Sequence, residues 1–145
     1  MADIVFNIAK GAVAEMARDD ATKFGILLLK VVEADATLID YDTVAAILGG
    51  ANTEADFTNY ARKTGLTGTL AVDDTGNVVT VDLADQTWTS AGNGSNNNLV
   101  KLIVFYENAA ADATRIPCTA HDFVATTDGN DLLAQLTTAY FFQAA

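Results

Sequence analysis

Three residues of the types used in thiol catalysis, Cys118, His121 and Asp122, lie within a five-residue stretch. A catalytic cysteine and its histidine base must approach to about 3 Å, the distance of a hydrogen bond. The surrounding segment, Ile116–Ala125, favours a strand, and residues three apart on a strand point to opposite faces. We therefore expect a buried thiol near a histidine, no catalytic residue and no enzymatic activity.

Two Asp-rich stretches carry the oxygen ligands that calcium prefers, Asp73-Asp-Thr-Gly-Asn and Asp128-Gly-Asn-Asp. Neither is part of a helix–loop–helix calcium site, whose loop closes with a glutamate. Turns in which Asp and Asn side chains bond to their own backbone explain both stretches. A zinc site would need more ligands than the one His and one Cys of this chain provide. We expect no metal and no cofactor, with a small calcium- or carbohydrate-binding β-domain as an alternative.

The stretch EADFTNYARKT, Glu54–Thr64, alternates in polarity and predicts a strand. On such a strand Thr58, Tyr60 and Arg62 share one face. Tyr and Arg are enriched in interface hot spots, because each offers a large contact area and directional hydrogen bonds. We expect these three residues in an interface, with a solvent-side cross-strand pair as the alternative. Trp88 is a further interface candidate, for which a core position is the favoured alternative.

Composition restricts the possible partners of the chain. Its 145 residues are 50% hydrophobic, which predicts one domain, residues 1–145, with a proper core. The net charge is −11, and among the eight Lys and Arg residues only Arg62 and Lys63 are adjacent. Nucleic-acid binding depends on clustered basic residues, so we expect no nucleic-acid partner, and for the same reason no anionic membrane surface.

The apolar stretches, the N-terminal residues and the single cysteine indicate the compartment in which the chain folds. The longest apolar stretch, Gly25–Val32, is interrupted by Lys30 and is far shorter than a membrane span. The N-terminal Met1-Ala-Asp lacks the basic region of a signal peptide, and a single cysteine forms no internal disulfide. Synthesis and folding in a cytoplasm are expected.

The pattern of apolar and turn residues predicts the elements. The N-terminal third reads as a helix around Ala9–Met16 capped by Asn7, a central strand Phe24–Val32, and a two-turn helix within Asp40–Gly50 capped by Asp40 or Asp42. Helical spacing then nearly vanishes. The expected strands are Thr69–Val72 and Val78–Leu83, which form a hairpin, then Leu99–Tyr106, Ile116–Ala125 and, in preference to a helix, Leu132–Phe142.

Strands joined mostly by turns predict a mainly β, α+β fold: an antiparallel sheet or β-sandwich with one or two short helices in the N-terminal third. The uncharged loop Ser90–Asn98 is too polar to bury itself, so we expect it to be mobile or ordered by a neighbour.

This layout resembles the small virion structural proteins of tailed bacteriophages. The similarity spans most of the chain, and its most specific element is Tyr60-Ala-Arg, introduced by the acidic Glu54. The C-terminal third resembles one subgroup of such proteins. The other shared pieces are the helix Ala9–Met16, the strand Gly25–Val32, the hairpin Val72–Leu83, the Trp-containing Gln86-Thr-Trp-Thr and the strand Leu99–Tyr106.

The resemblance implies a component of the virion. The leading expectation is a capsid decoration, or cement, protein on the head exterior that binds the major capsid protein as a homo-oligomer, either dimer or trimer. A tail, neck or fibre-base adaptor is the alternative. An acidic surface suits a protein that must stay soluble at high copy number and avoid the packaged genome.

Overall fold

The computed structural model describes residues 3–136 and 141–144, and the chain is mainly β. Strands hold 41% of the residues and helices 17%, so the predicted mainly β, α+β class is confirmed. Every strand pair is antiparallel. The described residues form three short helices where the sequence predicted one or two, because α2 (Asp35–Leu38), a single turn, carries no repeating apolar pattern that would predict it.

The main sheet has the strand order β1-β9-β8-β2-β3, and β4 also pairs with β2. Its members are β1 (Ile4–Val5), β2 (Phe24–Val31), β3 (Thr53–Glu54), β4 (Lys63–Leu66), β8 (Asn98–Glu107) and β9 (Arg115–Thr126). The central strands β2 and β8 are buried on both faces, which explains why their sequences are continuous apolar runs without alternation. The strands predicted at Phe24–Val32, Leu99–Tyr106 and Ile116–Ala125 are confirmed.

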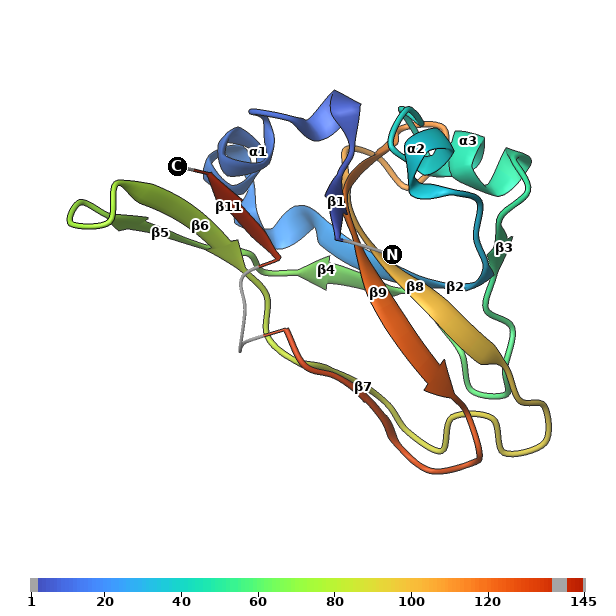
Figure 1. Ribbon diagram of the computed structural model, residues 1–145. Coiled ribbons are helices and arrows are strands. Elements are labelled where there is room, and N and C mark those ends of the chain that lie inside the picture. Colours follow the sequence, from blue (N-terminus) through green and yellow to red (C-terminus); the bar gives the residue numbers. More distant parts are fainter. Residues whose placement is uncertain (1–2, 137–140, 145) are drawn as a thin grey trace.

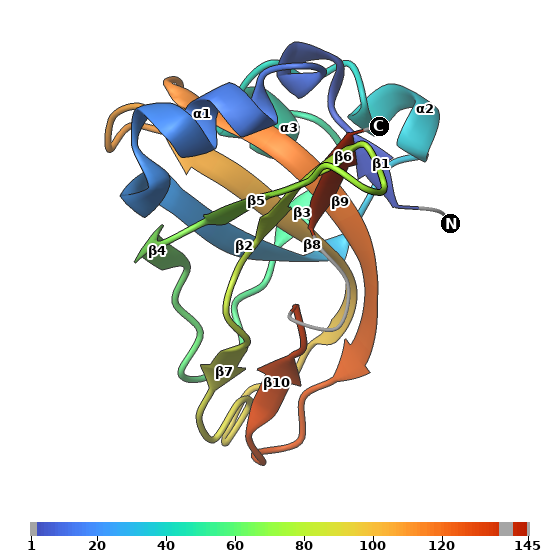
Figure 2. The same cartoon turned by 90° about the vertical axis from the view of Figure 1, so that its left-hand side faces the viewer.

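The elements around the main sheet form two further layers (Figures 1 and 2). Helices α1 (Val13–Asp19), α2 and α3 (Val44–Gly49) and the 3₁₀ turns η1 (Asn7–Ala9) and η2 (Ala21–Lys23) lie largely above the sheet in Figure 1. The two-stranded sheet β10-β7 lies below it. The three-stranded sheet β11-β6-β5 extends to the side. The bounds of these strands are β5 (Thr69–Asp73), β6 (Val78–Asp82), β7 (Gln86–Trp88), β10 (Leu132–Ala134) and β11 (Phe142–Ala144).

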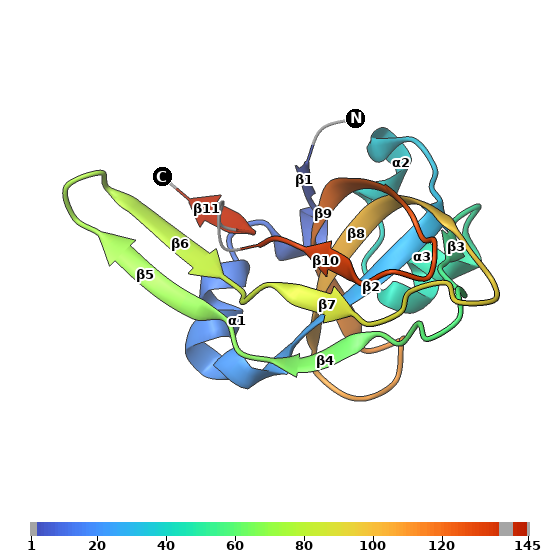
Figure 3. The same ribbon diagram turned by 90° about the horizontal axis from the view of Figure 1, so that it is seen from below.

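The hairpin of β5 and β6 projects from the body of the molecule (Figures 1 and 3). Its turn is closed by Asp73, whose Oδ1 accepts hydrogen bonds from the backbone N–H groups of Thr75 and Gly76. Asn77 takes a left-handed φ of 54°, which an asparagine tolerates. The predicted hairpin is confirmed, and the Asp-rich stretch serves as a turn.

Both predicted N-terminal helices are present, but the predicted caps are wrong. Asn7 donates a side-chain hydrogen bond to Asp40 and does not cap α1, which begins after Ala12. Helix α3 is capped by Thr43, whose Oγ1 accepts from the backbone N–H of Ala46. Thr43 adopts the extended backbone conformation that an N-cap requires.

The structure gives the conformation of two segments for which the sequence allowed alternatives. The loop Ser90–Asn98 is ordered by neighbours and partly buried, contrary to the expectation that it is too polar for burial. In the C-terminal segment the preference for strand over helix is confirmed by β10 and β11, while residues 137–140 lie outside the described residues. No helix among the residues described is long and apolar enough to cross a membrane.

Candidate functional site

The segment around Tyr60 and Arg62 is not the continuous strand that its alternation predicts. Pairing with β2 ends at Glu54 and resumes only at Lys63. Between them the chain turns at Asn59, which takes a φ of 71°. The prediction that Thr58, Tyr60 and Arg62 share one strand face is therefore wrong. The signal available in the sequence was the asparagine itself within an alternating run, since asparagine adopts left-handed conformations more readily than most residues.

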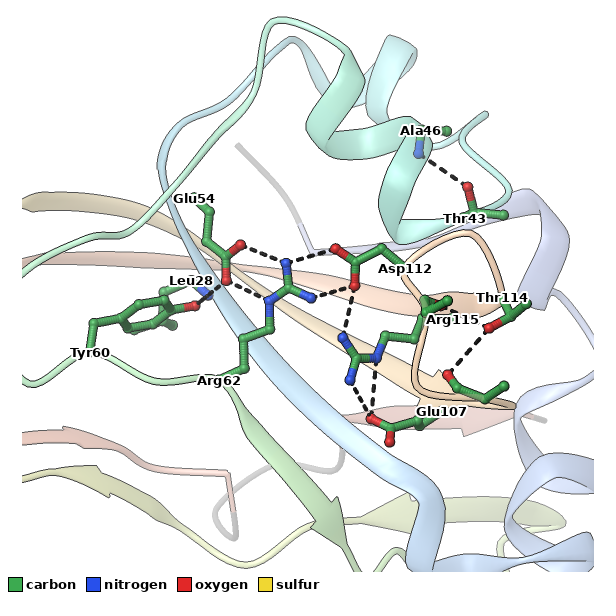
Figure 4. A network of polar contacts seen from close by, with 12 residues as sticks. Leu28, Thr43, Ala46, Glu54, Tyr60, Arg62, Glu107, Asp112, Thr114 and Arg115 are labelled. Carbon is green, nitrogen blue, oxygen red and sulfur yellow. Dashed lines mark hydrogen bonds and ion pairs between the residues drawn. The ribbon is translucent and has the colours of Figure 1, made fainter.

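Arg62 lies between two carboxylates, Glu54 and Asp112 (Figure 4). Its Nε and Nη2 donate to the two oxygens of Glu54 at 2.6 and 2.7 Å. Its Nη1 and Nη2 donate to the two oxygens of Asp112 at 2.5 and 3.1 Å. The planar guanidinium thus makes a two-point contact on each side, the arrangement in which arginine binds carboxylates most strongly.

A second arginine extends this network. Arg115 donates from Nη1 to Asp112 at 2.8 Å and from Nη2 to Glu107 at 2.9 Å. We call these five residues, Glu54, Arg62, Glu107, Asp112 and Arg115, the Arg62 cluster. Its side chains are 13–32% exposed, and they join β3, the approach to β4, the end of β8 and the start of β9. The backbone C=O of Asp112 also accepts from Ala45 in α3.

The electrostatics of the cluster favour its charged forms. The hydrogen bonds that Arg62 donates to Glu54 raise the pKa of Arg62, and burial opposes them without prevailing. Hydrogen bonds from Arg62 and Arg115 lower the pKa of Asp112. Three carboxylates face two guanidinium groups, so every charge has an opposite neighbour inside the chain.

Tyr60 fills a gap in the main sheet. Because β3 and β4 pair with different ends of β2, the backbone N–H of Leu28 between them has no strand opposite it. The Tyr60 hydroxyl accepts from this N–H at 3.1 Å and donates to Glu54 at 2.8 Å. Burial, and then the charge and hydrogen bond of Glu54, raise the pKa of Tyr60. Tyr60 therefore completes the hydrogen bonding of a central strand.

The other two interface candidates also have internal roles. Trp88 is 2% exposed, its Nε1 donates to the carbonyl of Ala61 at 2.8 Å, and the Lys63 ammonium lies 5.0 Å from its ring centre. The core position, the favoured alternative for Trp88, is confirmed. A side chain this buried is not exposed for an interface, so the interface expectation for Trp88 is wrong. Half-buried Thr58 holds the polar loop, exchanging hydrogen bonds with Ser95 through both its backbone N–H and its Oγ1.

Cys118 and His121 do not form a catalytic pair. Cys118 is fully buried with Sγ 3.9 Å from Met16 Sδ, and burial raises the pKa of its thiol to about 12. A thiol in that state is a poor nucleophile near neutral pH. His121 instead contacts Asp3 through Nδ1 at 3.0 Å and Thr119 through Nε2 at 2.8 Å.

A shallow cavity of about 180 Å³ opens beside His121. Asp3, Phe123, Leu136 and Phe141 are among its lining residues. Burial acts to raise the pKa of Asp3, but hydrogen bonds from His121 and the Asp122 amide outweigh it and lower the pKa. The volume is smaller than the roughly 300–1,000 Å³ of typical ligand pockets.

Lys101 is the buried ionisable residue that sequence reasoning missed. Its side chain is 0% exposed, and its ammonium lies 2.7 Å from Asp122 and 3.0 Å from Asp35. Burial acts to lower the pKa of Lys101, but the two carboxylates prevail and raise it. A lysine inside the apolar run Leu99–Tyr106 was the signal, since a charge at that position needs partners.

Within residues 3–136 and 141–144, no group of three or more His, Cys, Asp or Glu side chains is arranged to hold a metal ion. Comparison of the chain with protein-family models, with curated proteins and with solved structures found no match.

Proposed function

We propose that this chain is a structural protein of a tailed-phage virion, and specifically a capsid decoration protein made in the bacterial cytoplasm. In this role it binds the major capsid protein on the head exterior as a homo-oligomer and stabilises the assembled shell. It acts by occupying a repeated site, without catalysis or a cofactor. The sequence layout with Tyr60-Ala-Arg supports the virion assignment, and the surface of the structure supports a docking role.

The observation that carries the proposal is the projecting β5–β6 hairpin (Figure 3). Among the described strands none pairs with the outer edge of β5, and Thr69–Val72 carries no charge. Val72 is 57% exposed near the tip of this strand. Natural proteins usually protect a free edge with lysine, proline or a bulge. An edge that is uncharged from Thr69 to Val72, on a chain of net charge −11, is therefore suited to contact another protein.

The body of the molecule supports the same role. The Arg62 cluster and the Lys101 ion pairs use their charges internally, so they brace the fold that carries the hairpin. A small contact of this kind has low affinity alone. Repetition over a lattice, or within an oligomer, multiplies it through effective concentration.

A binding assay on undecorated heads tests the proposal. The purified chain is expected to bind saturably, with a copy number that matches a repeated lattice site. Val72→Asp is expected to weaken binding by at least about 1 kcal/mol per site, since a charge would be desolvated at the contact. Val124→Asp is the matched control, because it adds the same charge at a valine 87% exposed on β9.

Three results would count against the proposal in different ways. Failure of the chain to bind heads, with sedimentation on tails, would favour the tail or neck alternative. Equal binding by the two valine variants and the unmodified chain would remove the hairpin from the contact. Turnover of a substrate that is lost on replacing His121 would overturn the structural role itself.

A further inference from the structure

The polar loop contains the chain's single Asn-Gly pair, Asn93-Gly94. An asparagine followed by glycine is the sequence most prone to spontaneous deamidation, because glycine presents an unhindered backbone nitrogen. We infer that Asn93 is a site of self-modification, at which the Gly94 nitrogen attacks the Asn93 side chain in the folded protein. The feature that supports this is how differently the loop holds its four asparagines.

The reaction balances without any enzyme or oxidant. The Gly94 amide nitrogen loses its proton and bonds to Cγ of Asn93, and the side-chain nitrogen leaves as ammonia. The five-membered succinimide then takes up one water and opens at either carbonyl. The products are aspartate or β-linked isoaspartate at position 93, and the net exchange is ammonia for water.

The structure leaves the reacting groups of Asn93 unrestrained. Asn93 and Gly94 are both exposed, and neither the Asn93 carboxamide nor the Gly94 N–H makes a hydrogen bond to any residue described. Gly94 has a φ of 128°, a conformation that larger residues rarely adopt. Among the described residues, no hydrogen bond therefore has to break at the attacking nitrogen or at its target.

The other asparagines of the loop are held. Asn97 exchanges side-chain hydrogen bonds with Asp56, donating from Nδ2 at 2.9 Å and accepting at Oδ1 from its N–H at 2.8 Å. Asn98 accepts from the Thr126 hydroxyl, and the Asn96 amide lies against the carbonyls of Gly92 and Thr127. Each of these asparagines is also followed by a residue larger than glycine.

An aspartate–glycine pair, Asp128-Gly129, provides an internal comparison, because aspartate before glycine can form the same succinimide. The Gly129 N–H donates to the carbonyl of Ala91 at 2.7 Å, so its nitrogen is engaged. The Asp128 carboxylate accepts from the backbone and side chain of Asn130, which lowers its pKa and keeps it in the unreactive ionised form. The fold thus protects one pair and exposes the other.

Modification at Asn93 would loosen the loop. Gly92 on one side donates to the Thr58 carbonyl, and Ser95 on the other exchanges two hydrogen bonds with Thr58. Isoaspartate adds one carbon to the main chain between these two anchors. The spacing that lets both Gly92 and Ser95 bond to Thr58 is then lost. The loop therefore becomes less ordered as the protein ages.

Incubation of the full chain at 37 °C and mildly alkaline pH tests the inference. Peptide mass spectrometry is expected to show a gain of about one mass unit at Asn93, with Asn96, Asn97 and Asn98 unchanged. Isoaspartyl methyltransferase is expected to label the same peptide. Gly94→Ala is expected to preserve the Asn93 amide, and Asn93→Asp supplies the new charge without the extra main-chain carbon. Amide exchange at Thr58 and Ser95 should accelerate in the aged protein but not in freshly prepared Asn93→Asp, which has had no time to form isoaspartate through its own Asp-Gly pair.

The control is the same chain unfolded in urea, where no folded structure restrains the Asn and Asp side chains. There both Asn93 and Asp128 are expected to react, whereas the folded chain should react at Asn93 alone. The inference is overturned if folded Asn93 keeps its amide as long as Asn98 does. It is equally overturned if folding slows its loss by about tenfold, the factor that 1.4 kcal/mol of opening free energy imposes.

Discussion

Replacing Arg62 by alanine is expected to destabilise the fold, because the change removes the centre of the Arg62 cluster. The guanidinium makes four hydrogen bonds to Glu54 and Asp112, two on each side. Its loss leaves Glu54 at 21% side-chain exposure with the Tyr60 hydroxyl as its one donor among the described residues. Asp112 retains Arg115, so the larger penalty falls on Glu54.

The size of the effect lies between two known limits. Exposed ion pairs contribute about 0–1 kcal/mol, whereas breaking a buried pair by removing one partner costs about 3–5 kcal/mol. Arg62 is 19% exposed and its partners are 21% and 32% exposed, closer to the buried limit than to the surface. We therefore expect a loss of about 2–3 kcal/mol in the free energy of unfolding.

Urea unfolding monitored by tryptophan fluorescence measures this loss. Trp88 is the chain's one tryptophan and is 2% exposed, so its emission reports on the core. Arg62→Lys keeps the charge but loses the two-point contacts and should recover only part of the stability. A double-mutant cycle with Asp112→Asn isolates the pair's coupling, expected at about 0.5–3 kcal/mol for residues in one network.

A loss below about 0.5 kcal/mol, the range of ordinary surface substitutions, would refute the structural reading of Arg62. An unchanged unfolding curve combined with weaker binding to heads would instead restore the interface role expected from the sequence. Urea unfolding and head binding, measured on the same variant, therefore distinguish a structural role of Arg62 from an interface role.

Three further predictions concern single groups. Tyr60→Phe should cost about 1–3 kcal/mol, measured by urea unfolding, because the Leu28 N–H loses its acceptor; an unchanged midpoint would contradict this. Gly25→Ala should lower stability by about 1–3 kcal/mol, since the added carbon would meet the Phe105 ring and the Lys63 carbonyl, and a gain in stability would contradict this close packing. The raised pKa of Cys118 contributes stability that is present below pH 9 and is lost as the pH rises towards 12. Thiol alkylation should therefore track unfolding above pH 9, and Cys118→Ala should flatten that alkaline decline; alkylation of the folded chain at neutral pH would argue against the burial.

The strands were predictable where burial on both faces or a tight turn leaves a strong local pattern. The apolar runs that form β2 and β8, and the Asp-Asp-Thr-Gly-Asn turn between β5 and β6, are of this kind. The helix caps were not, because several polar residues precede each helix and the backbone conformation decides among them. Thr43 caps α3, although Asp40 and Asp42 lie nearby.

The roles of Tyr60 and Arg62 depended on a contact that local sequence does not encode. Alternation predicted a strand, but Asn59 turns the chain, and Arg62 meets Asp112 fifty positions away. The same residue types that mark an interface also satisfy buried polar groups. Only the tertiary arrangement distinguishes the two uses.

The pairing of the C-terminal strands has a consequence for synthesis of the chain. Among the described strands, β7 pairs only with β10, and β6, which already pairs with β5, gains its second neighbour in β11. A nascent chain that has reached Tyr106 can assemble the central pair of β2 and β8, yet Phe24 still lacks its edge-on contact with Phe141. The apolar flank that Phe141 covers in the finished fold is then still exposed. Pairings between segments this far apart in the sequence slow folding.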